Sequence, residues 1–235
     1  MSGHSKWSNI KNKKAANDAV KGSVFTKMAK AITVAVKKGG GIGDPDMNFS
    51  LRLAVDKARA VSMPKENIDR AIEKGMGTGA GEELAELVIE GFAPQGIALI
   101  LEVVTDSRNR TVSELRTLME KHGGRMGEPG SVMYLFDRCG IVTTEATITD
   151  ELELELIDLG MTDMVVEAEG TTIYTVPEAM YTVILFLEKQ GISVSGVLGY
   201  RPKSTMTVSD STSVENFLHT ISAYDDVQEV YVNLG

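Results

Sequence analysis

Apolar residues recur at helical spacing through the first third of the chain. Four of them lie four positions apart: Val24, Met28, Ile32 and Val36. This spacing predicts one buried face of a helix, and we expect the glycine-rich residues 39–43 to end it, because glycine is a poor helix former. Similar patterns predict helices over about residues 48–61 and 64–74, the latter with proline at its first position. Together they predict a small helical bundle over residues 1–77.

The period changes from helical to strand-like after the glycine-rich residues 75–81, which are interpreted as a flexible linker. Residues 84–92 and 97–105 predict two strands of a hairpin, because the turn-forming sequence Ala-Pro-Gln-Gly separates them. Thr111 and Glu114 resemble a capping box, which predicts the start of a helix that ends at the Gly-Gly pair following His122. Another strand is predicted over residues 131–136.

The order of elements is clearest between residues 139 and 200. The predicted strands cover residues 140–144, 164–167, 172–176 and 192–198, and the predicted helices cover residues 150–159 and 177–190. The order β-α-β-β-α-β is that of the ferredoxin-like, or split βαβ, arrangement. A helix over residues 214–223 and a strand over residues 227–232 remain for the C-terminal tail.

These elements predict an α+β multidomain protein with one domain inserted in another. The N-terminal helical bundle covers residues 1–77, and its basic arm either stays separate or packs on the middle domain. The middle α+β domain is predicted to combine residues 78–136 with residues 205–235, because residues 78–136 need the tail to complete a sheet with helices. The ferredoxin-like domain, residues 137–204, would then be the insertion.

Composition is that of an ordinary globular protein, with 43% hydrophobic and 24% charged residues among 235. No run of 18 apolar residues occurs, so we expect no membrane span. The N-terminal sequence lacks the apolar core of a secretory signal, and the single cysteine, Cys139, cannot form an internal disulfide. We therefore expect a cytoplasmic protein.

Charge is distributed very unevenly along the chain. Residues 1–77 contain 15 lysines and arginines against 7 acidic residues, a net charge of +8. Residues 78–235 contain 9 basic and 26 acidic residues, a net charge of −17. Such asymmetry between the parts of a chain suggests that the basic part binds a polyanion such as nucleic acid, even though the whole chain is acidic.

Side chains that commonly carry catalysis are sparse. The three histidines, His4, His122 and His219, are far apart in the sequence and have no partner at metal-ligand spacing. Cys139 has no neighbouring motif that would lower its pKa, which favours a buried structural thiol. Asp44-x-Asp46-x-Asn48 resembles the start of an EF-hand loop but lacks the later glycine and glutamate, so a turn and helix cap explain it more simply. We expect no enzyme, no metal and no cofactor.

Lysines dominate the N-terminal arm. Five of them are interleaved with asparagines and one tryptophan: Lys6, Lys11, Lys13, Lys14 and Lys21. Clustered lysines release counterions from phosphates, so they give salt-sensitive, sequence-independent affinity. Trp7 either stacks on an unpaired base or anchors the arm against the next domain. Farther along, Lys27, Lys30, Lys37 and Lys38 are predicted on the side of their helix that faces away from the apolar stripe.

Arginines form a second basic cluster, with Arg108, Arg110 and Arg116 around the start of the helix that follows the hairpin. A helix N-terminus with arginines can bind phosphate. The alternative is pairing within the chain to Asp106, Glu114 or the acidic tail. The acidic residues 150–158 are interpreted as a solvated face that would repel nucleic acid.

Several long segments are similar to a known family. They include GHSKWSNIKNKKAANDA (residues 3–19), FTKMAKAITVAVKKGGG (residues 25–41), LRLAVDKARAVSMPKENIDRAIEKG (residues 51–75) and GGRMGEPGSVMYLF (residues 123–136). The chain closely resembles the YebC/PmpR family, which extends to the mitochondrial translational activator of cytochrome oxidase subunit one. The resemblance implies three domains, a helical one and two α+β ones, and a role either as a DNA-binding transcriptional regulator or as a ribosome-associated translation factor. It supplies no catalytic residue.

The resemblance also implies that the following residues face the polynucleotide: Gly3, His4, Ser5, Lys6 and Trp7, then Lys11, Lys13, Lys14, Gly39, Gly40 and Gly41, and Met63-Pro64-Lys65. With Lys21, Lys27, Lys30, Lys37, Lys38, Arg108 and Arg110 from the charge pattern, these form the predicted nucleic-acid-binding set. The predicted function is a non-catalytic DNA-binding regulator of gene expression. The alternatives are a ribosome- or RNA-binding translation factor that relieves stalling, and a ligand-sensing ferredoxin-like module.

Overall fold

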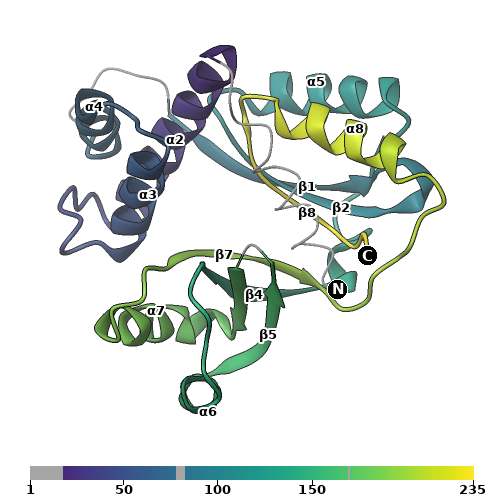
Figure 1. Cartoon of the computed structure of the whole chain (residues 1–235). Helices are drawn as coiled ribbons and strands as arrows, with labels where there is room; N and C mark the ends of the chain where they lie inside the picture. The colour runs from purple at the N-terminus through teal and green to yellow at the C-terminus, as the bar shows by residue number, and fades with distance from the viewer. Residues whose placement is uncertain (1–17, 78–82, 169) are drawn as a thin grey trace.

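The computed structural model describes residues 18–77, 83–168 and 170–235 (Figure 1). Three helices form its N-terminal part: α2 (Asp18–Lys38), α3 (Phe49–Ala60) and α4 (Lys65–Gly75). They enclose an apolar cluster that includes Ile32, Val36, Leu51 and Ile68. The predicted helical bundle is therefore confirmed for the described residues. Gly75 was assigned to a linker, but it ends α4, where a Cβ would lie 2.6 Å from the Cβ of Val36; the rest of that linker falls largely outside the described residues.

A tight turn links α2 to α3. Gly40 and Gly41 have φ angles of +72° and +82°, which favour glycine and end the helix as predicted. Asn48 caps α3 by accepting a hydrogen bond from the Leu51 amide at 3.1 Å, and its Nδ2 donates to Ala35 O at 3.1 Å. A Cβ on Gly39 would lie 2.1 Å from that Nδ2. The turn-and-cap interpretation of this segment is confirmed.

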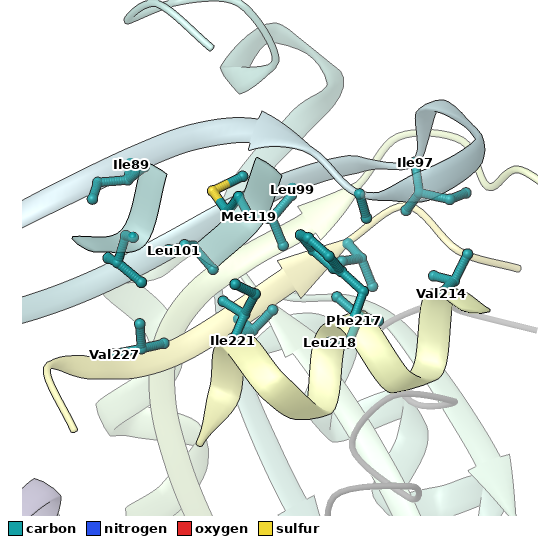
Figure 2. Packing of buried hydrophobic residues seen from close by; sticks show 14 of the residues in the cluster. Ile89, Ile97, Leu99, Leu101, Met119, Val214, Phe217, Leu218, Ile221 and Val227 are labelled. Atoms are coloured by element: carbon teal, nitrogen blue, oxygen red, sulfur yellow. The ribbon is translucent and has the colours of Figure 1, made fainter. Parts of the chain in front are cut away.

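The first sheet has the strand order β3-β1-β2-β8 and is antiparallel throughout. Its strands are β1 (Ala85–Phe92), β2 (Ala98–Thr105), β3 (Arg125–Met126) and β8 (Val227–Val232). Helices α5 (Arg108–Lys121) and α8 (Ser211–Ser222) cover one face (Figure 1). Between sheet and helices lies the cluster of Figure 2, where Leu99, Leu101 and Met119 meet Phe217 and Ile221. The predicted hairpin is confirmed, and the tail supplies a strand beside β2.

Two predictions in this region were wrong. Helix α5 begins after Ser107, so Thr111 does not cap it; Thr111 is buried inside the first turns, with its hydroxyl 2.7 Å from that of Thr105. Residues 131–136 do not form a strand, because the carboxylate of Glu90 accepts hydrogen bonds from the amides of Val132 and Met133, both at 2.8 Å. The segment instead forms a short 3₁₀ helix, and the strand starts only at Phe136.

The second sheet has the strand order β5-β6-β4-β7, again antiparallel. Its elements are β4 (Phe136–Thr144), α6 (Asp150–Asp158), β5 (Met161–Glu167), β6 (Gly170–Thr175), α7 (Met180–Lys189) and β7 (Ser195–Pro202). The predicted β-α-β-β-α-β order is confirmed. The last strand is displaced from its predicted start at residue 192, because β7 pairs with β4 from Ser195 onward. The division into three domains with an insertion stays a prediction.

The helical part contacts both sheet units. Phe49 and Leu53 of α3 pack against the apolar cluster of the second unit, and the Phe49 ring lies 4.1 Å from that of Tyr181 in α7. Arg52 forms an ion pair with Glu188 at 3.2 Å. On the other side, α2 runs beside the end of α8 and the start of β8 (Figure 1). Within the described residues, no helix is long and apolar enough to cross a membrane.

Candidate nucleic-acid interface

The predicted binding residues divide into those that the structure describes and those that it does not. Outside the described residues lie Gly3, His4, Ser5, Lys6, Trp7, Lys11, Lys13 and Lys14, as does the side chain of Lys21. Their predicted contact with nucleic acid, and both alternatives for Trp7, stay predictions. The described members come from α2, the glycine turn, and the starts of α4 and α5.

Two lysines of α2 point toward the C-terminal part of the chain. The Lys27 ammonium donates a hydrogen bond to the carbonyl oxygen of Ser222. The Lys30 ammonium forms an ion pair with Asp226 and also lies 3.3 Å from the Asp225 carbonyl oxygen. The Lys30 side chain is only 16% exposed. In this conformation both lysines join α2 to the segment between α8 and β8, so phosphate would have to compete with partners inside the chain.

Asp226 is the centre of this junction. It is 4% exposed, and besides Lys30 it accepts a hydrogen bond from the Thr111 hydroxyl at 2.5 Å and lies 3.3 Å from Arg110. Burial alone would raise the pKa of Asp226, but the hydrogen bonds from Lys30 and Thr111 outweigh it and hold the pKa below its ordinary value. Arg110 also pairs with Asp106 at 2.6 Å. The structure thus shows the intramolecular alternative for Arg110.

Two other lysines of α2 remain accessible at its C-terminus. Lys38 pairs with Glu86 at 2.7 Å, and Lys37 lies 3.9 Å from Glu83; both lysines are exposed. Exposed pairs of this kind contribute about 0–1 kcal/mol, so a phosphate can replace the carboxylate at little cost. The exposed backbone of Gly40 and Gly41 follows directly. This end of α2 is the described part of the predicted set best able to meet a polyanion.

Lys65 and Arg108 occupy the first positions of α4 and α5, and both are exposed. Neither forms an ion pair with another residue in the described ranges. The amides at a helix N-terminus favour anions, and a cation there adds charge attraction. Geometry therefore permits phosphate contact at both positions, although the two helices belong to different parts of the molecule.

Acidic residues gather elsewhere. Five of the nine residues of α6 are acidic, namely Asp150, Glu151, Glu153, Glu155 and Asp158. Figure 1 places α6 on the far side of the second sheet, away from α2 and α4. Within the described part of the chain, the most acidic helix thus lies apart from the predicted binding residues on α2 and α4, and that helix would repel a polyanion.

The remaining candidates for chemistry are dispersed. Cys139 is buried, and burial raises the pKa of its thiol to about 11, so the expected structural thiol is what the structure shows. His122 and His219 are both exposed, the first at the end of α5 and the second on α8. In the described ranges, no group of three or more histidine, cysteine or acidic side chains is arranged to hold a metal ion.

Asp226 was missed by reasoning from the sequence. Its main partner, Lys30, lies 196 residues earlier in the chain, and no local spacing connects them. The only sequence signal is the pair Asp225-Asp226 directly before a strongly apolar strand. A carboxylate at such a position requires a partner if it is buried, but the pattern does not identify which one.

Known proteins resemble the chain over nearly its whole length. Residues 5–78 match the family described as TACO1/YebC protein N-terminal domain, and residues 84–234 match TACO1/YebC second and third domain. A "Probable transcriptional regulatory protein" of Kosmotoga olearia is 42% identical over 238 residues, covering 99% of this chain and 94% of that protein. One of Halothermothrix orenii is 43% identical over 241 residues, with the same coverage. The crystal structure of a conserved hypothetical protein from Aquifex aeolicus has a TM-score of 0.83 at 39% identity, covering 93% of this chain and 91% of that one.

Proposed function

This chain belongs to the TACO1/YebC family, and from that premise we propose that it is a non-catalytic regulator of gene expression that binds nucleic acid through its basic N-terminal part. The relatives described above are named "Probable transcriptional regulatory protein", which supports DNA as the first partner to test. The proposal includes action in the cytoplasm and contact through the predicted set of basic residues.

The observation that carries the proposal is the separation of charge. Residues 1–77 have a net charge of +8 in a chain whose total is −9, and the most acidic described helix, α6, lies away from α2 and α4. A uniform acidic surface would repel a polyanion. A basic end on an acidic body instead orients the molecule and confines contact to that end.

Contacts among the described residues limit which part of the basic surface is available to nucleic acid. Lys27 and Lys30 are engaged with the C-terminal part of the chain, so they are the least available for phosphate. Lys37 and Lys38, the glycine turn, and Lys65 remain exposed. The proposed interface therefore combines the N-terminal arm with the end of α2 and the start of α4.

Charge reversal in the arm tests the proposal. The variant Lys11→Glu, Lys13→Glu, Lys14→Glu is compared with the wild type for binding to duplex DNA over a range of salt concentrations. Each phosphate contact contributes about 0.9 to the salt slope on B-DNA, so the slope should fall by about 3 and affinity at physiological salt should be lost. The matched control reverses Lys121, Lys189 and Lys203, three exposed cations outside both basic clusters.

The control should lose less affinity than the arm variant, although both change the net charge equally. Circular dichroism and the unfolding midpoint of all three proteins should agree, which shows that each is folded; the side chains changed in the control are exposed. If the arm variant binds as tightly as the wild type, the N-terminal part is not the contact surface and the proposal fails.

An RNA partner is the second candidate, and the polar face of α4 favours it. That face carries cations and acids in alternation, including Arg70 and Lys74 next to Asp69 and Glu73. Base reading in the major groove typically uses a helix that presents several arginine, asparagine or glutamine side chains to the base edges. A mixed-charge face fits recognition of shape and phosphates better, as on ribosomal RNA. Competition between duplex DNA and structured RNA for the same protein separates the two.

A further inference from the structure

A pocket of about 710 Å³ opens between α2 and α4. Its apolar wall includes Phe25 and Met63, and its polar wall includes Asn67, Arg70 and Lys74. Pockets that bind small organic molecules have volumes of about 300–1,000 Å³ and combine apolar walls with a few polar groups. This pocket has the size and lining of such a site. It shares only Lys30 and Met63 with the polynucleotide-facing residues named above.

The charges around the pocket do not cancel. Lys30 is neutralised by Asp226, and the acidic Asp106 at the rim is neutralised by Arg110 at 2.6 Å. Glu73 is engaged in an interaction within the chain. Arg70 and Lys74 have no ion pair with any residue in the described ranges, so they are the cations left to attract an anion.

Geometry places these two cations together. Arg70 and Lys74 are four positions apart on α4, so their side chains project from the same face, one turn from each other. Arginine presents several donors in a planar group that suits phosphate oxygens, and lysine adds a compact charge. On α2, facing α4 across the pocket, Phe25 supplies an aromatic ring and Thr26 a hydroxyl.

We propose that this pocket binds a nucleotide, with its phosphate on Arg70 and Lys74 and its base against the ring of Phe25. The amide of Asn67, which lines the same pocket, can both donate and accept hydrogen bonds at a base edge. The nucleotide is either free or one unit of a polynucleotide held by the neighbouring interface. The inference rests on the proposed function only for that second source.

Titration with defined probes tests the pocket. Adenosine monophosphate, adenosine, inorganic phosphate and a single-stranded oligonucleotide are each added to the full-length protein, and binding is measured by calorimetry. The variant Arg70→Ala, Lys74→Ala is expected to bind the phosphate-bearing ligand at least tenfold more weakly. The control Lys121→Ala, Lys189→Ala removes two exposed cations outside the pocket and both basic clusters, and should stay within twofold of the wild type.

A second variant tests the ring. Phe25→Leu keeps an apolar side chain on α2 but removes the stacking surface, so affinity for adenosine monophosphate or for the oligonucleotide should fall by about fivefold or more. Affinity for inorganic phosphate should not change. Unchanged circular dichroism and unfolding midpoint show that each variant is folded.

The results also identify the source of the nucleotide. Saturable binding of adenosine monophosphate that the pocket variant loses indicates a free nucleotide. A loss confined to the oligonucleotide indicates a polynucleotide unit. If the pocket variant binds every probe as the wild type does, the inference is overturned, whereas the proposed function fails only if the arm variant Lys11→Glu, Lys13→Glu, Lys14→Glu keeps its affinity.

Discussion

Replacing Asp226 by asparagine should loosen the junction between the helical part and the C-terminal part of the chain. Asp226 is 4% exposed in the wild type. Its carboxylate forms ion pairs with Lys30 and Arg110 and accepts a hydrogen bond from the Thr111 hydroxyl. Asparagine keeps the size and one acceptor but removes the charge. The Lys30 side chain, 16% exposed, then loses its ion pair and keeps the Asp225 carbonyl oxygen, 3.3 Å away, as a backbone acceptor.

The expected loss in free energy of unfolding follows from the burial of the Lys30–Asp226 ion pair. Removing one partner of a buried ion pair costs about 3–5 kcal/mol, because the other charge stays buried without compensation. Lys30 keeps one backbone acceptor and Arg110 keeps Asp106, so we expect the lower end, about 3 kcal/mol. With a urea m value of about 2 kcal/mol/M, the unfolding midpoint of the helical part should fall by about 1.5 M.

The assay is urea unfolding of the full chain at neutral pH, followed by far-ultraviolet circular dichroism. Lys30→Met and the double variant complete a double-mutant cycle, which should give a coupling free energy of about 1–3 kcal/mol between the two residues. Asp225→Asn is the matched control. Its carboxylate is exposed and, among the residues that the structure describes, accepts a hydrogen bond only from the Ser23 hydroxyl, at 2.6 Å. This variant should therefore cost less than about 1 kcal/mol.

Acid should remove the stabilisation that the Asp226 carboxylate contributes to the folded chain. The pKa of Asp226 is lowered in the folded chain because the hydrogen bonds from Lys30 and Thr111 outweigh burial. Its stabilising effect is therefore complete above the unfolded-state pKa of about 3.9 and is lost as pH falls through the lower folded-state pKa. The stability difference between wild type and Asp226→Asn should shrink below about pH 4. A difference under about 1 kcal/mol at neutral pH, equal to that of Asp225→Asn, would refute the reasoning.

Three further predictions concern the buried turns and the thiol. Glu90→Gln should cost about 2 kcal/mol, because the wild-type carboxylate accepts hydrogen bonds from three backbone amides; hydrogen exchange at those amides should accelerate, and unchanged exchange would contradict the prediction. Gly39→Ala should cost about 1–2 kcal/mol by displacing the cap at Asn48, whereas Gly22→Ala, with open space around its Cβ position, should be neutral or stabilising in the same thermal melt. Cys139, with a pKa of about 11, should react with a maleimide at neutral pH only after unfolding; rapid modification of the folded protein would show that the thiol is accessible.

The elements that the sequence predicted well are those with a long local period. Helix α2, with its stripe from Val24 to Val36, and strand β8, predicted at the bounds observed, both bury a face that the alternation of apolar and polar residues already marks. The order of elements in the second sheet follows in the same way. Periodicity reports which face of an element is buried, and that was enough for the fold class.

The elements that were mispredicted depend on distant side chains. Residues 131–136 have strand-like composition, but Glu90, more than 40 positions earlier, binds their amides. Thr111 has the spacing of a helix cap, but its side chain is buried and its hydroxyl donates a hydrogen bond to Asp226. Lys30 likewise pairs with Asp226, which lies 196 residues later in the chain, and its predicted contact with nucleic acid stays a prediction. Local patterns carry no information on partners so far apart.

Crosslinking in living cells tests the central claim most directly. After ultraviolet irradiation, the protein is purified under denaturing conditions, the attached nucleic acid is sequenced, and the crosslinked peptides are identified. The account predicts attached nucleic acid with crosslinks concentrated in residues 1–77, and strongly reduced recovery for the arm variant; DNA supports a role in transcription and ribosomal RNA a role in translation. The account would be contradicted if the wild type recovered no more nucleic acid than the arm variant, or if the crosslinks were confined to residues 137–204.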